Sequence, residues 1–349
     1  MAAGSKFPLL QLPHEALLRT FRIMNLYHIL KFSFISKRCK DLVLSVQIKG
    51  TYFNVFIGRT IEIFAGPYGK FPFTFYTEPD MYWGMGAYGR KKKLTAPQSV
   101  LVKRSEKRRA KKCRKNALSM KEWLEHIQLI FNYSKIDYIV FLEDSFEFDI
   151  DDIKEVFGNV PSLRFDNTGC YEFNQKIIEK FPLTEWLTIK TDDFQDSKVP
   201  KSLLLQNFSE LWIEWDSRDD HHAIISLDEL LLINSKVITA ESLRLTPKQL
   251  NTFIKLWQKG ANPRMEVLSI YFQNYEESDE EIFMKGIKHQ VIPAGQSRYF
   301  KSAGREGILS VKGGMDFYRI DGVKATIEKN SFYSQWFMYV WFDHCVMES

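Results

Sequence analysis

The sequence FPLLQLPHEALLRTFRIMNLYHILKFSFISKRCKDLVLSVQ, from Phe7 to Gln47, predicts the first folded module of the chain. Pro13 suits the first turn of a helix, where a backbone N–H is not needed. The next helix carries apolar residues at Leu17, Phe21 and Met24, a spacing that places them on one helical face. A further helix with one apolar face is predicted from Ile35 to Val46, so the stretch should form a small helical module.

This module is too small to bury its own apolar surface. Three short helices in about 40 residues cover little area by themselves. We therefore expect some apolar side chains to face outward, where a partner covers them. The side chains expected to face outward are Leu12, Leu17, Leu18, Leu30 and Phe34.

The same stretch resembles an F-box. The resemblance rests on Leu12-Pro13-x-Glu15, Leu17-Leu18, Ile35-Ser36-Lys37-Arg38 and Leu42-Val43. An F-box docks the small Skp adaptor of SCF-type ubiquitin ligases, so the resemblance implies that adaptor as a partner and, through it, a cullin. The expected contact residues are Leu12, Pro13, Leu17, Leu18, Leu30 and Ile35.

The composition of the 349 residues allows one large domain or two. An apolar content of 45% is enough for a sizeable core, and no apolar run approaches the length of a membrane span. The first ten residues have no apolar signal core, and the four cysteines form no C-x-x-C pair. We expect reduced thiols and a location in the cytoplasm, the nucleus or both, with no membrane partner.

Two segments of different character follow the predicted F-box at residues 7–48. Residues 49–89 begin with alternating β-branched and aromatic residues around Gly58, which predicts a β-hairpin joint. Residues 90–117 are basic, with thirteen Lys or Arg and one acid between Arg90 and Lys115. Such runs are typical of a solvated, disordered insert, a nuclear-import signal or a nucleic-acid contact. Aromatic residues are absent between Lys91 and Lys115, which argues against a base-stacking surface.

Residues 118–349 read as one α/β domain with a repeat of about 24 residues. An apolar-x-apolar strand core recurs, and helix-like stretches lie between the cores. One strand and one helix per repeat predict a leucine-rich-repeat-like horseshoe with parallel strands, closed by a β-rich C-terminal cap. The predicted cores are Ile139-x-Phe141, Leu163-x-Phe165, Leu187-x-Ile189, Leu211-x-Ile213, Leu243-x-Leu245 and Leu268-x-Ile270.

The second half also resembles a known family, the type-2 F-box-associated domain of nematode F-box proteins. The matching stretches are Leu203–Phe208, Asp228–Ser235, Leu250–Gly260 and Asn262-Pro263-Arg264. In those proteins an F-box precedes this domain, as it does here. Leu250, Phe253, Ile254 and Trp257 lie on one helical face and should be core residues rather than catalytic ones.

Recognition residues are expected on the strand face that points away from the helices. The residue between each apolar pair points to that face, and Trp and Arg often dominate binding energy there. The predicted target-binding residues are Arg164, Trp186, Trp212 and Arg244.

The predicted function is therefore a non-enzymatic adaptor of a ubiquitin ligase. The F-box would bind the Skp adaptor, and the C-terminal domain would bind an unknown protein target. We expect no catalytic residue, metal or cofactor, because the one dense polar cluster, Arg218–His222, lacks the spacing of a ligand set. The alternatives are a nucleic-acid-associated protein that uses the basic segment and an F-box scaffold that degrades nothing.

Overall fold

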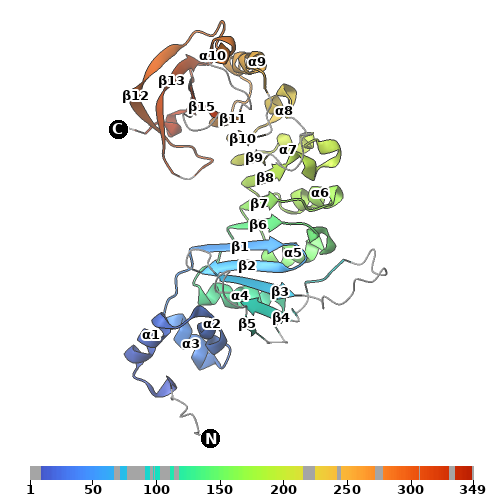
Figure 1. Ribbon diagram of the computed structural model, residues 1–349, viewed down its shortest axis with the longest axis vertical. Coiled ribbons are helices and arrows are strands. Elements are labelled where there is room, and N and C mark those ends of the chain that lie inside the picture. Colours follow the sequence, from blue (N-terminus) through green and yellow to red (C-terminus); the bar gives the residue numbers. More distant parts are fainter. Residues whose placement is uncertain are drawn as a thin grey trace. The chain divides into compact units, whose positions relative to one another are not determined.

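The computed structural model describes residues 9–66, 71–76, 91–94, 97, 99–102, 111–113, 118–214, 225–241, 245–271, 278–305, 307–329 and 335–347. Its contacts divide the chain into two compact units, Met1–Val160 and Pro161–Ser349. Both units combine helices with a β-sheet (Figure 1), so the predicted mixed α/β class with N-terminal helices is confirmed.

The first unit begins with a short 3-10 helix, η1 (Leu9–Gln11), and three α-helices. Side chains from the loops start two of these helices. Asn25 caps α2 by accepting a hydrogen bond from the backbone N–H of Tyr27, and Ser36 caps α3 by accepting one from Cys39. The three helices are α1 (His14–Ile23), α2 (Leu26–Ser33) and α3 (Lys37–Ser45).

A later helix, α4 (Met120–Ile130), completes the core of this helical module. Its residue Ile130 packs in one cluster with Leu17, Phe21, Ile29 and Val43. The side chains of Leu17, Leu18 and Leu30 are 4%, 9% and 2% exposed, so the expectation that they face outward is wrong. The three helices bury these leucines because they pack on one another and on α4, which the local sequence does not reveal.

Polar and aromatic contacts fix α4 to α2. The Ser33 hydroxyl oxygen lies 2.8 Å from His126 Nε2 in a buried hydrogen bond. The next residue, Phe34, stacks on the His126 ring at 4.0 Å between centroids and meets the edge of Trp123 at 4.9 Å. Ser119 starts α4 with a capping box, in which Glu122 takes part. The helical module is thereby continuous with the rest of the first unit.

The sheet of the first unit has the strand order β6-β1-β2-β3-β4-β5. β1 pairs in parallel with β6, and the other neighbours are antiparallel, with the predicted hairpin formed by β1 and β2. The 3-10 turn η3 (Ser145–Glu147) and α5 (Ile150–Phe157) follow β6. The strands are β1 (Tyr52–Ile57), β2 (Ile61–Gly66), β3 (Phe71–Tyr76), β4 (Ser99–Val102), β5 (Lys111–Cys113) and β6 (Tyr138–Phe141).

The basic segment is structured at its described residues, 91–94, 97, 99–102 and 111–113, and the rest of the predicted disordered insert over residues 90–117 lies outside the described residues. Two pieces of it form β4 and β5, and Val100 is buried. Lys92 Nζ lies 2.5 Å from Glu147, and Lys93 pairs with Asp149 at 2.9 Å. These lysines hold the segment against η3 and α5, because Glu147 and Asp149 carry the opposite charge.

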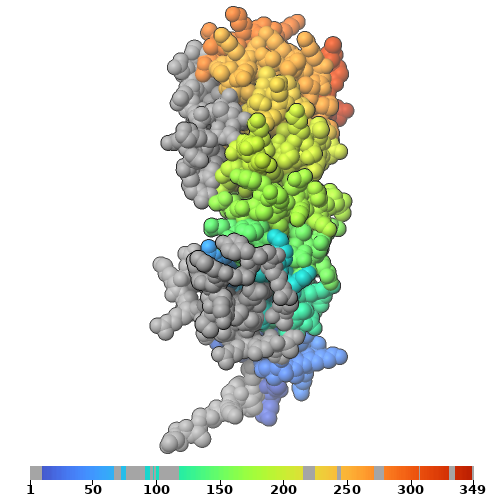
Figure 2. All heavy atoms as spheres, turned by 90° about the vertical axis from the view of Figure 1, so that its right-hand side faces the viewer, coloured from blue at the N-terminus to red at the C-terminus, as the bar shows by residue number. Residues whose placement is uncertain are grey.

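The second unit contains five parallel strands, and a helix follows each of the first four. The strand order over the whole unit is β12-β13-β14-β15-β11-β10-β9-β8-β7. Parallel pairing runs from β7 to β11, and Figure 1 shows α6 to α9 on one side of these strands. Figure 2 shows that helix-bearing side as a surface of packed side chains. The elements are β7 (Ser162–Phe165), α6 (Tyr171–Lys180), β8 (Trp186–Lys190), α7 (Lys201–Leu204), β9 (Glu210–Glu214), α8 (Leu227–Leu232), β10 (Val237–Ala240), α9 (Pro247–Gln258) and β11 (Val267–Tyr271).

One predicted strand core is wrong. The strand between β9 and β11 is Val237–Ala240, in which Ile238 pairs with Leu211 on one side and Leu268 on the other. Leu245, assigned to the predicted core Leu243-x-Leu245, is a buried loop residue just before α9. The error arose because β10 carries the small residue Ala240 where the pattern calls for a large aliphatic side chain.

An antiparallel cap ends the second unit. Strand β15 pairs with β11, and β14, β13 and β12 follow outward from it. The cap includes α10 (Ser278–Phe283), β12 (Gln290–Phe300), β13 (Leu309–Tyr318), β14 (Lys324–Lys329), β15 (Gln335–Trp341) and the 3-10 turn η6 (Asp343–Cys345). Its core packs Phe300, Val311, Tyr339 and Trp341 against Val237 and Val267 of the parallel strands. The predicted β-rich C-terminal segment therefore packs onto β10 and β11.

Candidate binding surfaces and a buried polar cluster

The predicted adaptor-binding residues separate into buried and accessible groups. Leu17, Leu18 and Leu30 belong to the helical core, as described above. Ile35, by contrast, is 70% exposed, Pro13 is exposed and Leu12 is half-buried. Of the six predicted residues, these three can be touched directly by a partner.

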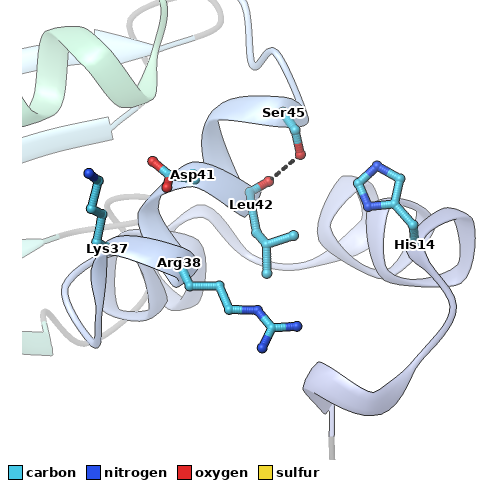
Figure 3. Close-up of a pocket in the computed structure, with 6 residues that line it drawn as sticks. All are labelled: His14, Lys37, Arg38, Asp41, Leu42 and Ser45. Carbon is cyan, nitrogen blue, oxygen red and sulfur yellow. Dashed lines mark hydrogen bonds between the residues drawn. The ribbon is translucent and has the colours of Figure 1, made fainter.

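A hollow of 440 Å³ lies beside this accessible group, between α1 and α3 (Figure 3). Figure 3 shows the apolar side chain of Leu42 between Arg38 and His14. Lys37 and Asp41 also line it, so the surroundings of the apolar residue are mostly basic. Sequence reasoning missed this hollow because it is formed by the first residue of α1 and one face of α3, which only the packing of the helices brings together.

In the second unit, three of the predicted target-binding residues, Arg164, Trp186 and Trp212, lie on the strand face opposite the helices. Arg164, Thr188 and Trp212 occupy one register row across β7, β8 and β9, and Thr239 continues the row on β10. Arg164 and Trp212 are half-buried. Of the four predicted residues, Arg164 and Trp212 therefore share one row with Thr188 and Thr239, whereas Trp186 pairs with Ser162 and Glu210 in another row.

Ion pairs and a hydrogen bond hold the large side chains of this row. The Arg164 guanidinium donates to Glu214 at 2.9 Å, and Trp212 Nε1 donates to Glu241 at 3.3 Å. Lys190 pairs with Asp166 at 2.9 Å on the same face. Burial raises the pKa of Glu214, and the Arg164 charge acts in the opposite direction. The face is thus polar, and its charged groups are mutually paired.

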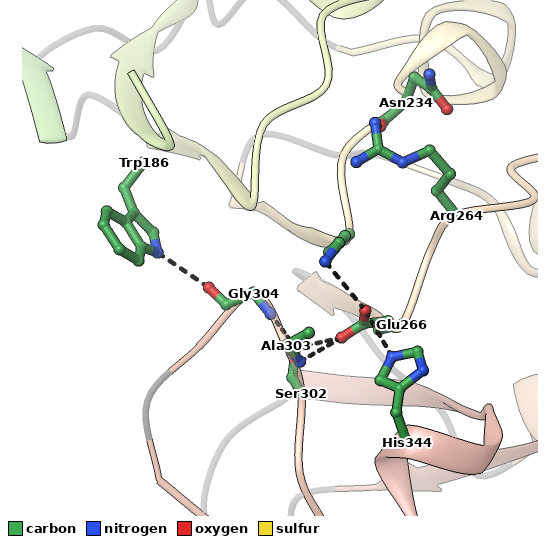
Figure 4. A network of polar contacts seen from close by, with 9 residues as sticks. Trp186, Asn234, Arg264, Glu266, Ser302, Ala303, Gly304 and His344 are labelled. Carbon is green, nitrogen blue, oxygen red and sulfur yellow. Dashed lines mark hydrogen bonds and ion pairs between the residues drawn. The ribbon is translucent and has the colours of Figure 1, made fainter. Parts of the chain in front are cut away.

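Residues 301–305, here called the strap, lie over this face at the starts of β8 and β9. Trp186 Nε1 donates to the carbonyl of Gly304 at 2.9 Å (Figure 4), and Arg305 forms an ion pair with Glu210. A Cβ at Gly304 would lie 2.4 Å from the carbonyl oxygen of Ser209, so the strap lies directly against the chain there. Trp186 is therefore half-buried beneath the strap. The fourth predicted residue, Arg244, lies outside the described residues.

Glu266, just before β11, is the centre of a buried polar cluster (Figure 4). It is 1% exposed, and its Oε2 accepts hydrogen bonds from the Ser302 hydroxyl at 2.8 Å and the Ala303 backbone N–H at 2.7 Å. Its Oε1 lies 3.1 Å from His344 Nε2 and 3.9 Å from Lys236 Nζ. The carboxylate therefore joins the strap and the end of the chain to the parallel strands.

Cys345 is buried beside this carboxylate. Burial and then the Glu266 charge raise the pKa of the thiol to about 12. Ligand atoms of Glu266, His344 and Cys345 all lie within 4.8 Å of one another. Sequence reasoning missed the cluster because Glu266 stands far from the other two along the chain. The polar cluster that it did consider, Arg218–His222, lies outside the described residues.

None of the helices in the described part of the chain combines the length and the apolar character that a membrane crossing requires.

Comparison with known proteins identifies two domains. Residues 9–50 match the F-box domain family, and residues 199–270 match the F-box associated family. The F-box associated domain-containing protein sdz-33 of Caenorhabditis elegans is 21% identical over 265 residues, which cover 74% of this chain and 76% of the relative. No solved structure gives a significant match. The two family resemblances read from the sequence are therefore confirmed.

Proposed function

Because the chain is an F-box protein with an F-box associated domain, we propose that it is the target-recognition subunit of an SCF-type ubiquitin ligase. The observation that supports this most directly is the presence of both domains in one chain, in the order F-box and then F-box associated domain. F-box domains bind Skp adaptors, and F-box proteins are generally non-catalytic. The proposed role requires no chemistry from this chain, only two binding surfaces.

The first proposed surface docks the Skp adaptor through the α1–α3 side of the F-box. Ile35, Pro13 and Leu12 would supply apolar contact, and the hollow around Leu42 would receive a side chain of the adaptor. Leu17, Leu18 and Leu30 would act from beneath by fixing the helices. The helices α1 to α3 carry six Lys or Arg against Glu15 and Asp41, so the facing surface of the adaptor should be acidic.

The second proposed surface binds the target through the row that contains Arg164 and Trp212. A half-buried Trp and an Arg in one row favour a binding hot spot, because hot spots are enriched in these two residue types. Trp186 would support this surface from beneath the strap, and the contribution of Arg244 stays a prediction. The paired charges on the face favour a polar segment of the target with charges of both signs.

A leucine-rich-repeat-like arrangement of β7 to β11 stays part of this proposal. It is supported by the repeated parallel strand and helix. A buried polar chain also runs between repeats, from Thr168 to Asn174 at 2.6 Å and from Asn174 to the carbonyl of Asp193 at 2.6 Å. Such a chain would take the place of the Asn ladder of typical repeats.

The described structure gives the nucleic-acid alternative less support than the sequence pattern does. Lys92 and Lys93, two of its basic residues, are paired with acids of the same unit, so their charges are partly neutralised within the chain. A nuclear-import role for residues 90–117 stays a prediction. Binding to phosphate would weaken steeply with added salt, whereas apolar docking of the adaptor would not.

The proposed function can be tested by capture of partners from cells. The wild-type chain and the double variant Arg164→Ala, Trp212→Ala are isolated, and their partners are identified by mass spectrometry. Both should retain the Skp adaptor, and only the wild type should retain the ubiquitylated target. The control is Tyr171→Ala, which removes an aromatic side chain that is 48% exposed at the start of α6. Equal target capture by the double variant would rule out this surface.

A further inference from the structure

We propose that Glu266, His344 and Cys345 form a zinc site that fastens the end of the chain to β11. The three residues come from two distant parts of the sequence, and folding brings their ligand atoms within 4.8 Å of one another. Glu266 and Cys345 are buried, at 1% and 0% exposure, while the His344 side chain is 54% exposed. The cluster thus has a closed inner side and one side open to solvent.

The donor set favours zinc among common metal ions. A thiolate, an imidazole and a carboxylate are all established zinc ligands, whereas magnesium and calcium select oxygen ligands alone. Three protein ligands leave one tetrahedral position for water, which could enter beside the half-exposed His344. The cluster is therefore suited to a three-ligand site with an accessible fourth position.

The distances in the cluster agree with a shared metal. Two nitrogen or oxygen ligands of a tetrahedral zinc lie about 3.3 Å apart, given bond lengths of about 2.0–2.1 Å. The measured separation of Glu266 Oε1 and His344 Nε2 is 3.1 Å. His344 and Cys345 are neighbours in the short turn η6, and their ligand atoms lie within 4.8 Å of each other and of Glu266.

The surroundings of Glu266 support one metal-binding oxygen. Ser302 and Ala303 both donate to Oε2, which holds the carboxylate and leaves Oε1 directed to the His344 side (Figure 4). Such outer hydrogen bonds are typical of metal-binding carboxylates. Lys236 is the group that a cation would displace, and its side chain is 31% exposed and can turn to solvent.

Binding must release a proton from Cys345. The thiol loses its proton to solvent, the sulfur forms a bond to zinc and the imidazole binds in its neutral form. Because zinc takes the place of this proton on the sulfur, zinc affinity should fall as the pH is lowered.

The test uses the full chain, purified without metal and titrated with zinc against a chromophoric chelator. The wild type should bind one zinc per chain. Cys345→Ser and His344→Ala should each weaken binding by more than about 100-fold, since loss of an outer partner alone costs about 10- to 100-fold. Cys170→Ser and His289→Ala, which change the same residue types elsewhere, should bind as the wild type does.

One further variant and a spectrum separate a metal site from a purely structural cluster. Lys236→Gln should strengthen zinc binding, because it removes the competing cation. Cobalt in place of zinc should show a thiolate-to-cobalt charge-transfer band, and Cys345→Ser should abolish it. His344→Ala alters a half-exposed side chain and should fold normally by circular dichroism. The proposal would be overturned if the wild type bound no zinc in the titration. It would also be overturned if the Cys345 and His344 variants bound zinc with the affinity of the wild type.

Discussion

The substitution Ile35→Ala separates docking of the Skp adaptor from folding of the F-box. Ile35 is 70% exposed, so its removal should cost little stability in the free chain. Full burial of an Ile side chain contributes about 1.5–3 kcal/mol. If the adaptor covers the exposed 70%, the loss on substitution is about 1–2 kcal/mol, or roughly 5- to 30-fold in Kd.

Leu17→Ala is the matched control, because it changes a buried residue of the F-box rather than an exposed one. Leu17 is 4% exposed and packs in the cluster with Phe21 and Ile130, so the substitution leaves a cavity. We expect the free energy of unfolding of the first unit to fall by about 2–5 kcal/mol. Any loss of adaptor binding in this variant should follow the loss of folded protein.

Calorimetric titration with purified Skp adaptor, together with thermal unfolding of each variant, measures both quantities. Wild-type affinity in Ile35→Ala would refute the proposed docking surface. An unchanged melting temperature in Leu17→Ala would refute the assignment of Leu17 to the core.

Three further predictions concern the rest of the chain. Gly304→Ala should lower the melting temperature, because its Cβ would lie 2.4 Å from the Ser209 carbonyl oxygen. The control Gly295→Ala should leave the melting temperature unchanged, because nothing lies within 4 Å of a Cβ at that position. Equal effects of the two substitutions would contradict the described strap. Burial raises the pKa of Asp193 to about 7 from 3.8, so the folded state binds more protons than the unfolded state between these values, and stability should fall as pH rises across that range. Asp193→Asn should lack this pH dependence of the melting temperature, and Asp192→Asn should retain it. Deletion of residues 90–117 should destabilise the first unit because it removes β4 and β5, and an unchanged melting temperature would restore the interpretation as a solvated insert.

Local patterns in the sequence predicted local structure well. Asn25 and Ser119 are caps of a kind that the sequence can indicate, because a cap needs only the next few residues. Helix α9 buries Leu250, Phe253, Ile254 and Trp257, and Gly260 adopts a φ of +106° just after it. In these cases the decisive contacts lie within one or two helical turns.

Contacts between residues that are far apart in the sequence could not be predicted from local patterns. Leu17 is buried in a cluster that includes Ile130 of α4, which is remote in sequence. Trp186 was expected to be free for a target, yet the strap from the C-terminal cap covers it. The cluster around Glu266 has the same cause, since His344 and Cys345 reach it only through the folding of the cap.

The central claim, that this chain is a subunit of an SCF ubiquitin ligase, is tested most directly by assembly from purified components. The full chain is mixed with Skp adaptor and cullin, and the mass of the product is measured by size-exclusion chromatography with light scattering. We expect one complex that contains a single copy of each protein. A chain that stays separate, while another F-box protein assembles under the same conditions, would contradict the account.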